Sequence, residues 1–190
     1  MRDRFWAGLA AGALAAGWGC SGAREHPTGK GNEHPAPLQE GPKRVRAALK
    51  DAAGKALGTA VFYEEPGGVR VALDVTGIEP GPHGFHIHAV GKCEGPDFAS
   101  AGGHFNPAGR KHGLKNPEGP HFGDLPNLVV GPEGRGTIEH FAPALVLEGE
   151  GNALLQPGGT ALVIHAKADD EVTDPAGNAG PRVACGVIAR

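Results

Sequence analysis

Apolar and polar residues alternate in several short stretches of this chain. In VRVALDVT, residues 69–76, every second residue is valine or leucine. A period of two is typical of a β-strand that buries one of its faces. Similar but less regular stretches cover residues 45–50, 57–64, 128–130, 136–141, 160–166 and 183–189. No helical repeat interrupts these stretches, so the pattern predicts an all-β protein.

Turn-forming residues separate the predicted strands. The 190 residues include 33 glycines and 17 prolines, and only 5% are aromatic. Short strands joined by many turns are typical of an antiparallel β-sandwich or barrel. The chain is long enough for one ordinary domain. Its net charge of −3 lacks the basic surplus that nucleic-acid binding requires, so we expect no nucleic-acid partner.

The first 19 residues have the features of a secretory signal. Arg2 and Arg4 precede residues 5–19, an apolar and glycine-containing run that is short for a membrane span. The run leads into ALAAGWGC, which resembles a bacterial lipoprotein signal, in which the cysteine, here Cys20, is lipidated and becomes the first mature residue. The alternative is ordinary signal cleavage that leaves Cys20 as a spare thiol.

Residues 20–42 are rich in glycine, proline and charged residues and show no apolar periodicity. Such a segment cannot bury enough apolar surface to become ordered, so we predict a flexible tether. The folded domain is accordingly predicted to span residues 43–190, after a signal of residues 1–19 and the tether.

A stretch between Val90 and Leu128 has almost no strand pattern and is rich in metal-binding side chains. They are Cys93, His104, His112, His121 and Asp124. A loop of this length inside a compact domain is either functional or a mistaken assignment. A metal ion and a disulfide can hold such a loop in place when it has too few apolar residues to pack by itself.

Two histidines alternate with apolar residues in GFHIH, residues 84–88. On a strand, residues two apart lie on the same side, so His86 and His88 project together while the alternate residues face the core. Such a pair is half of a metal site, although a His-x-His pair alone is also compatible with an ordinary surface. His165, at the end of another predicted strand, can supply a third imidazole.

Five motifs occur in a fixed order within residues 44–190. They are GFHIH, GGHFNPAGRKHG, HFGDLPN, VIHAKADD and GNAGPRVACGVI. Together they resemble copper/zinc superoxide dismutase. The resemblance implies a Greek-key antiparallel β-sandwich, or flattened eight-stranded barrel, with long metal-binding and electrostatic loops. It also implies an enzyme that converts two superoxide anions and two protons to dioxygen and hydrogen peroxide by copper redox cycling.

The resemblance further implies one copper and one zinc ion per subunit. The implied copper ligands are His86, His88, His104 and His165. The implied zinc ligands are His104, His112, His121 and Asp124, with His104 bridging the two ions. Imidazoles suit both metals, and three histidines with one carboxylate are typical of a closed tetrahedral zinc site.

Other residues have supporting roles by the same resemblance. Asp169 matches the outer carboxylate that hydrogen-bonds one ligand of each metal, here His86 and His112. Arg182 matches the guanidinium that lies beside the copper and attracts the anion. His104 takes up a proton during the cycle and passes it to the peroxide product.

Cys93 and Cys185 match the internal disulfide of the family. Because a disulfide needs an oxidising compartment, and the signal segment leads to one, we expect the protein in the periplasm or cell envelope. Lipidation at Cys20 would attach it to a membrane and would account for the odd cysteine. Bacterial members of the family include both monomers and homodimers, so the subunit state stays open.

Two functional questions also stay open at the level of the sequence. A copper- and zinc-binding envelope protein without catalysis would keep the metal ligands, although the presence of Arg182 favours the enzyme. The implied electrostatic loop, residues 167–181, is acidic, with Asp170, Glu171 and Asp174 in addition to Asp169. These acids either channel superoxide toward Arg182 or reduce its rate of association.

Overall fold

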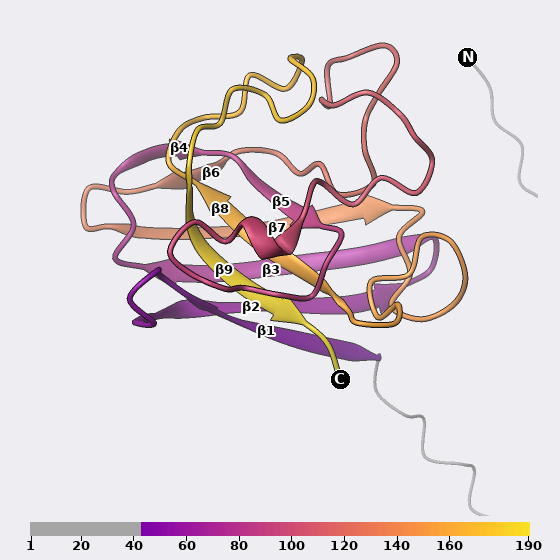
Figure 1. The fold of residues 1–190 in the computed structure, drawn as a ribbon, viewed down its shortest axis with the longest axis horizontal. Coiled ribbons are helices and arrows are strands. Elements are labelled where there is room, and N and C mark those ends of the chain that lie inside the picture. The colour runs from indigo at the N-terminus through magenta and orange to yellow at the C-terminus, as the bar shows by residue number, and fades with distance from the viewer. Residues whose placement is uncertain (1–42) are drawn as a thin grey trace, which may run out of the picture. The chain divides into compact units, whose positions relative to one another are not determined.

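The structure, a computed structural model, describes residues 43–190 (Figure 1). Within them the chain forms nine strands and one short 3-10 helix, so the predicted all-β class is confirmed. The elements are β1 (Arg44–Lys50), β2 (Ala56–Glu65), β3 (Gly68–Thr76), β4 (Gly81–His83), β5 (Phe85–His88), η1 (Ala99–Ala101), β6 (Leu128–Val130), β7 (Arg135–Pro143), β8 (Thr160–His165) and β9 (Arg182–Ile188). The predicted signal, residues 1–19, and tether, residues 20–42, lie outside the described residues together with Cys20, and stay predictions.

The period-two pattern of the sequence places the core as expected. In β3 the alternate residues Val69, Val71, Leu73 and Val75 are at most 3% exposed. The residues between them are half-buried or exposed. Strand β3 therefore gives one apolar face to the core, and the sheet curves around this face.

The strands form one sheet that nearly closes into a barrel. Their order is β4-β6-β7-β3-β2-β1-β9-β8-β5, and every pairing of neighbouring strands is antiparallel. The outermost strands, β4 and β5, are separated in the chain by Gly84 alone, so the two ends of the sheet meet there. The pairings of β3 with β7 and of β5 with β8 join distant segments, as in the predicted Greek key.

Nine strands are present where the resemblance implied eight. At Gly84 the chain changes its partner, because β4 pairs with β6 whereas β5 pairs with β8. The Gly84 N–H donates to Lys167 O, and Gly84 O accepts from His165 N, both at 2.8 Å. A Cβ atom at position 84 would lie 2.9 Å from the Ala179 side chain. The additional strand is therefore a break within one stretch, residues 81–88, which the sequence pattern presents as continuous.

Two long loops carry the remaining chain. Residues 89–127 connect β5 to β6 and contain η1 as their only helix or strand, as the missing strand pattern predicted. Residues 166–181 connect β8 to β9, and Figure 1 shows this loop above the barrel beside the later part of the first one. The predicted disulfide is present, and the Cα atoms of Cys93 and Cys185 are 5.6 Å apart, so the first loop is tied to β9. No helix within residues 43–190 is long and apolar enough to cross a membrane.

Candidate metal centre

Strand β5 carries the first two histidines of the site. Phe85 and Ile87 are fully buried in the main core, and His86 and His88 project from the opposite face. The β5–β6 loop runs back along β5 and forms isolated antiparallel bridges that pair His88 with His104 and His86 with Asp124. The loop thereby brings its own histidine and carboxylate against the His-x-His pair.

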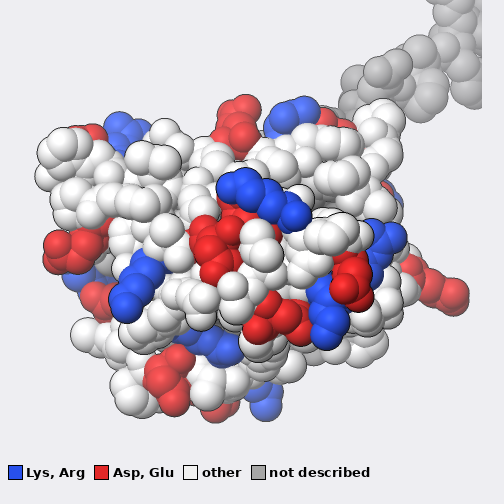
Figure 2. Space-filling view, turned by 90° about the horizontal axis from the view of Figure 1, so that it is seen from above, with Lys and Arg blue, Asp and Glu red and all other residues white. Residues whose placement is uncertain are grey.

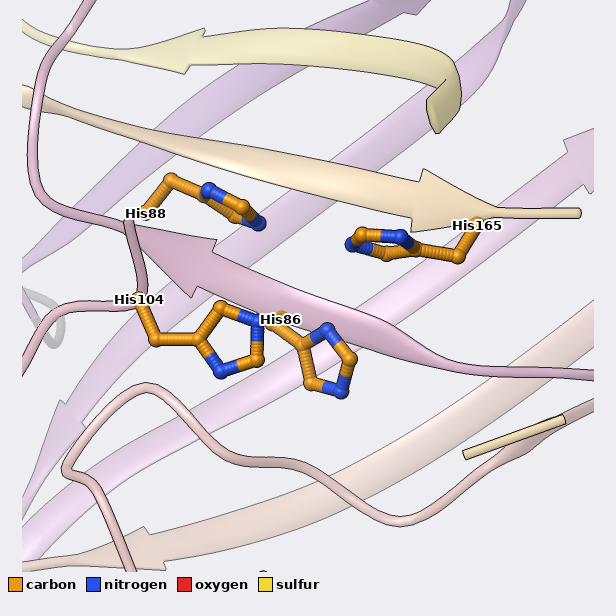
Figure 3. A group of neighbouring side chains, drawn as sticks. All are labelled: His86, His88, His104 and His165. Atoms are coloured by element: carbon orange, nitrogen blue, oxygen red, sulfur yellow. The ribbon is translucent and has the colours of Figure 1, made fainter. Parts of the chain in front are cut away.

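Four imidazoles converge at this point (Figure 3). They come from β5, from the end of β8 and from the β5–β6 loop, and their ligand atoms all lie within 4.8 Å of one another. We call this group the histidine set; its members are His86, His88, His104 and His165. Three members are at most 4% exposed, and His104 is half-buried.

One nitrogen of each ring in the histidine set has no hydrogen-bond partner although it is buried. These atoms are His86 Nδ1, His88 Nε2, His104 Nε2 and His165 Nε2. They are four of the five buried side-chain nitrogen or oxygen atoms without a partner in residues 43–190. Buried polar atoms are nearly always paired, so a cluster of unpaired nitrogens around one point indicates a site for a cation.

The second nitrogen of three of these rings is held by an acceptor. His88 Nδ1 donates to Gly102 O and His165 Nδ1 to Gly180 O, both at 2.9 Å. His86 Nε2 lies 2.7 Å from Asp169 Oδ2. Because a carbonyl oxygen only accepts, the bonded nitrogens of His88 and His165 carry the hydrogen, and the opposite nitrogens keep a lone pair directed into the site.

Burial keeps the imidazoles of His86, His88 and His165 uncharged. It lowers the pKa of His86 to about 3 in spite of the hydrogen bond with Asp169. It lowers the pKa of His88 to about 2 and that of His165 to about 4, with a smaller contribution from the neighbouring His104. Neutral imidazole is the form that binds a metal ion, so these ligands are ready to bind at neutral pH.

A second group lies on the other side of His104. We call it the carboxylate set; its members are His104, His112, His121 and Asp124. The Nδ1 atoms of the three histidines lie 2.9, 3.0 and 3.2 Å from the same oxygen, Asp124 Oδ1. The other oxygen, Oδ2, accepts the backbone N–H groups of Gly113 and His121. A carboxylate oxygen has about two lone pairs, so three imidazole nitrogens around Oδ1 fit a shared cation better than three hydrogen bonds.

The carboxylate set is charged where the histidine set is neutral. Burial opposes ionisation of Asp124, but the hydrogen bonds from the three histidines outweigh it and hold the pKa of Asp124 far below its usual value. Burial likewise opposes protonation of His112, yet hydrogen bonds with Asp124 and Asp169 raise the pKa of His112 to about 9. His104 belongs to both sets, because its Nδ1 faces Asp124 and its Nε2 faces the other three histidines.

Asp169 connects the two sets. Its Oδ2 lies 2.7 Å from His86 Nε2, and its Oδ1 lies 3.0 Å from His112 Nε2. Asn127 fixes the backbone of Asp169 from both sides, because its Oδ1 accepts Asp169 N–H at 2.7 Å and its Nδ2 donates to Asp169 O at 2.8 Å. Sequence reasoning placed Asp169 but missed Asn127, although Asn127 ends the quoted motif HFGDLPN.

Gly177 leaves the space in which Asp169 sits. Its φ of +58° lies in the left-handed region, and a Cβ atom there would meet Asp169 Oδ1 at 1.6 Å. A larger residue is therefore excluded both by its backbone conformation and by the carboxylate. The glycine is part of the motif GNAGPRVACGVI, but its contact with Asp169 is visible only in the folded chain.

Arg182 lies at the mouth of the site. Its two terminal nitrogens donate to Phe98 O at 2.5 Å and to Gly102 O at 2.6 Å. Gly102 O also accepts from His88, so one carbonyl group fixes both side chains. A cavity of about 390 Å³ opens here, and its lining includes His88, His104, His165, Arg110 and Arg182. A molecule from solvent therefore reaches the histidine set through a cavity that Arg110 and Arg182 line.

Two further histidines in the fold lie outside both sets. His83 is buried, and its ring nitrogens contact the backbone oxygens of His165 and Glu79 at 2.7 and 2.8 Å. His140 is half-buried on β7, opposite Val71 of β3. All of the sequence-predicted ligands, in contrast, fall into one of the two sets or both.

Comparisons with known proteins decide the family. The family model of copper/zinc superoxide dismutase (SODC) matches residues 56–188. "Superoxide dismutase [Cu-Zn] 2" of Aquifex aeolicus is 48% identical over 147 residues, which cover 76% of this chain and 86% of that protein. The superoxide dismutase [Cu-Zn] of Caulobacter vibrioides is 44% identical over 145 residues, 75% of this chain and 83% of the relative.

Solved structures agree with the sequence comparisons. A double mutant of a SOD-like protein from Bacillus subtilis superposes with a TM-score of 0.74 at 41% identity, covering 76% of this chain and 97% of that one. Cu/Zn superoxide dismutase from Brucella abortus gives a TM-score of 0.63 at 32% identity, with coverage of 77% and 99%.

The chain belongs to the copper/zinc superoxide dismutase family. The resemblance drawn from the five motifs is thereby confirmed. As a copper/zinc superoxide dismutase, the protein is an oxidoreductase that acts on superoxide and uses copper and zinc as cofactors. The two donor sets fit these metals, since one is a cluster of unpaired buried imidazole nitrogens and the other adds a carboxylate to three imidazoles.

Proposed function

We propose that this superoxide dismutase holds copper in the histidine set and zinc in the carboxylate set, and that it works outside the cytoplasm. The single observation that carries the copper assignment is the cluster of four buried imidazole nitrogens without hydrogen-bond partners. An all-nitrogen, uncharged donor set suits copper, whereas three imidazoles and one carboxylate suit a closed tetrahedral zinc site.

Access to solvent supports the same assignment. The cavity of about 390 Å³ is lined by three members of the histidine set and by Arg182. Of the carboxylate set, His121 and the shared His104 also line this cavity, whereas His112 and Asp124 are at most 5% exposed and do not. The redox ion has to meet superoxide, so it belongs where the cavity reaches the ligands.

Bound copper supplies the one-electron exchange with superoxide, whereas zinc keeps its oxidation state. Arg182 attracts and orients the anion. A guanidinium group has five N–H donors, and Phe98 O and Gly102 O occupy two of them, so further donors are available for a two-point contact. The same two bonds keep the guanidinium from turning away from the cavity.

His104 is placed to hold a proton for the product. Its Nε2 is buried, faces the histidine set and has no other partner, while its Nδ1 lies 2.9 Å from Asp124 Oδ1. Two superoxide anions and two protons give one dioxygen and one hydrogen peroxide. In our proposal one of these protons is held at His104 Nε2 and the other comes from solvent through the cavity.

The proposed location rests on the disulfide and on the sequence ahead of the barrel. The Cys93–Cys185 disulfide forms and persists in an oxidising compartment such as the periplasm. The lipoprotein-type signal before Cys20 supports export and attachment to a membrane of the cell envelope. Fractionation of cells that express the full chain tests this, because Cys20→Ser should move the protein from the membrane fraction to the soluble envelope fraction.

Superoxide decay followed by stopped-flow or pulse radiolysis tests the copper assignment. The purified protein, loaded with one copper and one zinc, is compared with His165→Ala loaded in the same way. We expect the variant to lose at least about 100-fold in rate, because it lacks a ligand that faces the cavity. His140→Gln, which changes a histidine outside both sets, should keep the full rate. Activity of the wild type no higher than that of free copper would instead favour a non-catalytic metal-binding protein.

A further inference from the structure

The acidic residues of the β8–β9 loop all have partners within the described chain. They are Asp169, Asp170, Glu171 and Asp174. Lys115 Nζ lies 2.7 Å from Glu171 Oε2, and Lys111 Nζ lies 3.4 Å from Asp174 Oδ2. Figure 2 looks down on the end of the barrel that carries the loops, and acidic and basic side chains lie next to one another there. Lysines therefore pair with Glu171 and Asp174, and Asp169 is buried, so among the described residues Asp170 is the acid of this loop without a cationic partner.

Asp174 contacts the carboxylate set from outside. Its Oδ1 accepts the backbone N–H of His112 at 2.8 Å. The same oxygen lies 3.9 Å from Nε2 of His121. One carboxylate thus faces two of the three histidines of the set, through the backbone of the first and the ring edge of the second.

The turn that presents Asp174 is braced by its own hydrogen bonds. Asp170 Oδ1 accepts the backbone N–H groups of Val172 at 3.0 Å and Thr173 at 2.8 Å. Gly177 N–H then donates to Thr173 O at 2.7 Å. The turn fixes the backbone of Asp174, and the bond from His112 N–H gives its carboxylate a defined position.

His112 is consequently held at two points by the same loop. Asp174 binds its backbone N–H, and Asp169 Oδ1 lies 3.0 Å from its Nε2. These two contacts direct the remaining nitrogen, Nδ1, to a position 3.0 Å from Asp124 Oδ1. Loss of the Asp174 contact would leave a buried residue with a free backbone N–H and release the segment that carries the ligand.

We propose that Asp174 is a positioning residue for the carboxylate set, which fixes the backbone of His112 and thereby keeps zinc in place. The proposal rests on the assignment of zinc to this set. The hydrogen bond from His112 N–H to Asp174 Oδ1 supplies the effect, because its loss leaves a buried backbone N–H without an acceptor. The ion pair with Lys111 is exposed on both sides, 53% and 40%, and pairs of this kind contribute little.

Zinc affinity of the purified protein, measured by competition with a coloured chelator, tests the proposal. Partners outside the ligand shell typically change metal affinity by about 10–100-fold, and we expect the lower end, about tenfold, for Asp174→Ala. Asp174→Asn keeps an acceptor oxygen and should stay within about threefold of the wild type. Lys111→Gln removes only the ion pair and should change zinc affinity by less than about twofold.

A second readout separates positioning from general stabilisation. Cobalt(II) bound in place of zinc reports the ligand geometry through its visible spectrum, which should change in Asp174→Ala and stay the same in Lys111→Gln. The thermal midpoint of Asp174→Ala should fall more in the zinc-loaded than in the metal-free protein.

Three results would overturn the proposal. The first is a zinc affinity and a cobalt spectrum of Asp174→Ala that equal those of the wild type. The second is a thermal midpoint of Asp174→Ala that falls equally in the zinc-loaded and metal-free protein. The third is a zinc affinity of Asp174→Asn as low as that of Asp174→Ala, which would assign the effect to charge. Failure of the wild type to bind zinc at all would instead contradict the zinc assignment itself.

Discussion

The histidine set and the carboxylate set share His104 and lie against the same strand, yet they differ in charge. Burial lowers the pKa of His86, His88 and His165 to about 3, 2 and 4. In the carboxylate set, hydrogen bonds with two carboxylates overcome burial and raise the pKa of His112 to about 9. The same residue type is therefore uncharged on one side of the site and protonated, in the absence of metal, on the other.

The surroundings of each ring explain this difference. His88 and His165 donate to backbone carbonyls, which fix the ring but add no full charge. His86 contacts one carboxylate, Asp169, and remains dominated by burial. His112 lies between two carboxylates, Asp124 and Asp169. Opposite charge next to a ring favours its protonated form, whereas burial favours the neutral form, and the balance differs between the two sets.

Replacement of Asp124, the carboxylate ligand of the carboxylate set, should give the largest difference between the loss of zinc affinity and the loss of copper affinity. We expect Asp124→Asn to weaken zinc binding by more than about 100-fold, beyond the range seen for partners outside the ligand shell. Copper affinity should fall by less than about tenfold, since the Asp124 side chain contacts the histidine set through His104, and the backbone bridge between Asp124 and His86 is unchanged in the variant. Chelator competition measures both affinities. Asp74→Asn, which breaks an exposed pair with Arg135 on the barrel, is the control. A loss of copper affinity as large as the loss of zinc affinity would show that the two sets do not bind their metals independently.

Replacement of Asp169, which contacts one histidine of each set, should lower metal affinity less than replacement of Asp124, and should lower zinc affinity more than copper affinity. Asp169→Asn removes one charge from both His86 and His112. Zinc affinity is expected to fall about 10–100-fold. Copper affinity should fall less, because His88 and His165 keep their own backbone acceptors. The metal content after dialysis against a chelator measures the order of loss, and earlier loss of copper than of zinc would contradict the comparison.

Acidification should release zinc before copper. The pKa of His112 lies near 9, so in the metal-free protein this ring is protonated at pH 7 and zinc has to displace one proton. Zinc affinity should therefore rise about tenfold per pH unit up to about pH 9.

Copper affinity, in contrast, should hardly change with pH between pH 5 and 8. The pKa values of about 3, 2 and 4 in His86, His88 and His165 mean that no proton leaves these rings between pH 8 and 5. Titration calorimetry in buffers of different ionisation heat measures the proton count. When each metal is titrated alone into the metal-free protein, release of about one proton with zinc and about none with copper is expected. Equal counts would remove the charge difference between the sets.

The smallest effect concerns access to the histidine set. Arg110 is exposed and lines the cavity with Arg182, and its guanidinium donates only to Gly119 O within residues 43–190. We expect Arg110→Gln to lower the rate about two- to threefold at low ionic strength and to make no difference in about 0.5 M salt, where such charges are screened. Lys55→Gln, on the turn before β2, should leave the rate unchanged. A wild-type rate that rises with salt would contradict attraction of the anion by these arginines.

The sequence predicted most of the strands and the metal-binding residues. It was least informative about contacts between residues that are far apart along the chain. The alternation of Val69, Val71, Leu73 and Val75 predicted a half-buried strand because side-chain direction is a local property. It did not show the break at Gly84, since that break comes from pairing with two different strands. The roles of Asn127 and Asp174 were also missed, because their partners lie 42 and 62 residues away.

Sequence alone determined the type and spacing of the ligands, the all-β class and the family, because periodicity and motif order are written along the chain. Tertiary structure alone decided which nitrogen of each histidine faces the site. That choice depends on Gly102 O, Gly180 O and Asp169, which fold against the rings from other segments. It also decided that the acids of the β8–β9 loop pair with Lys111, Lys115 and the backbone of His112. The electrostatic energy of a bound metal or substrate depends on its distances to charged groups, and these distances cannot be read from the order of residues in the chain.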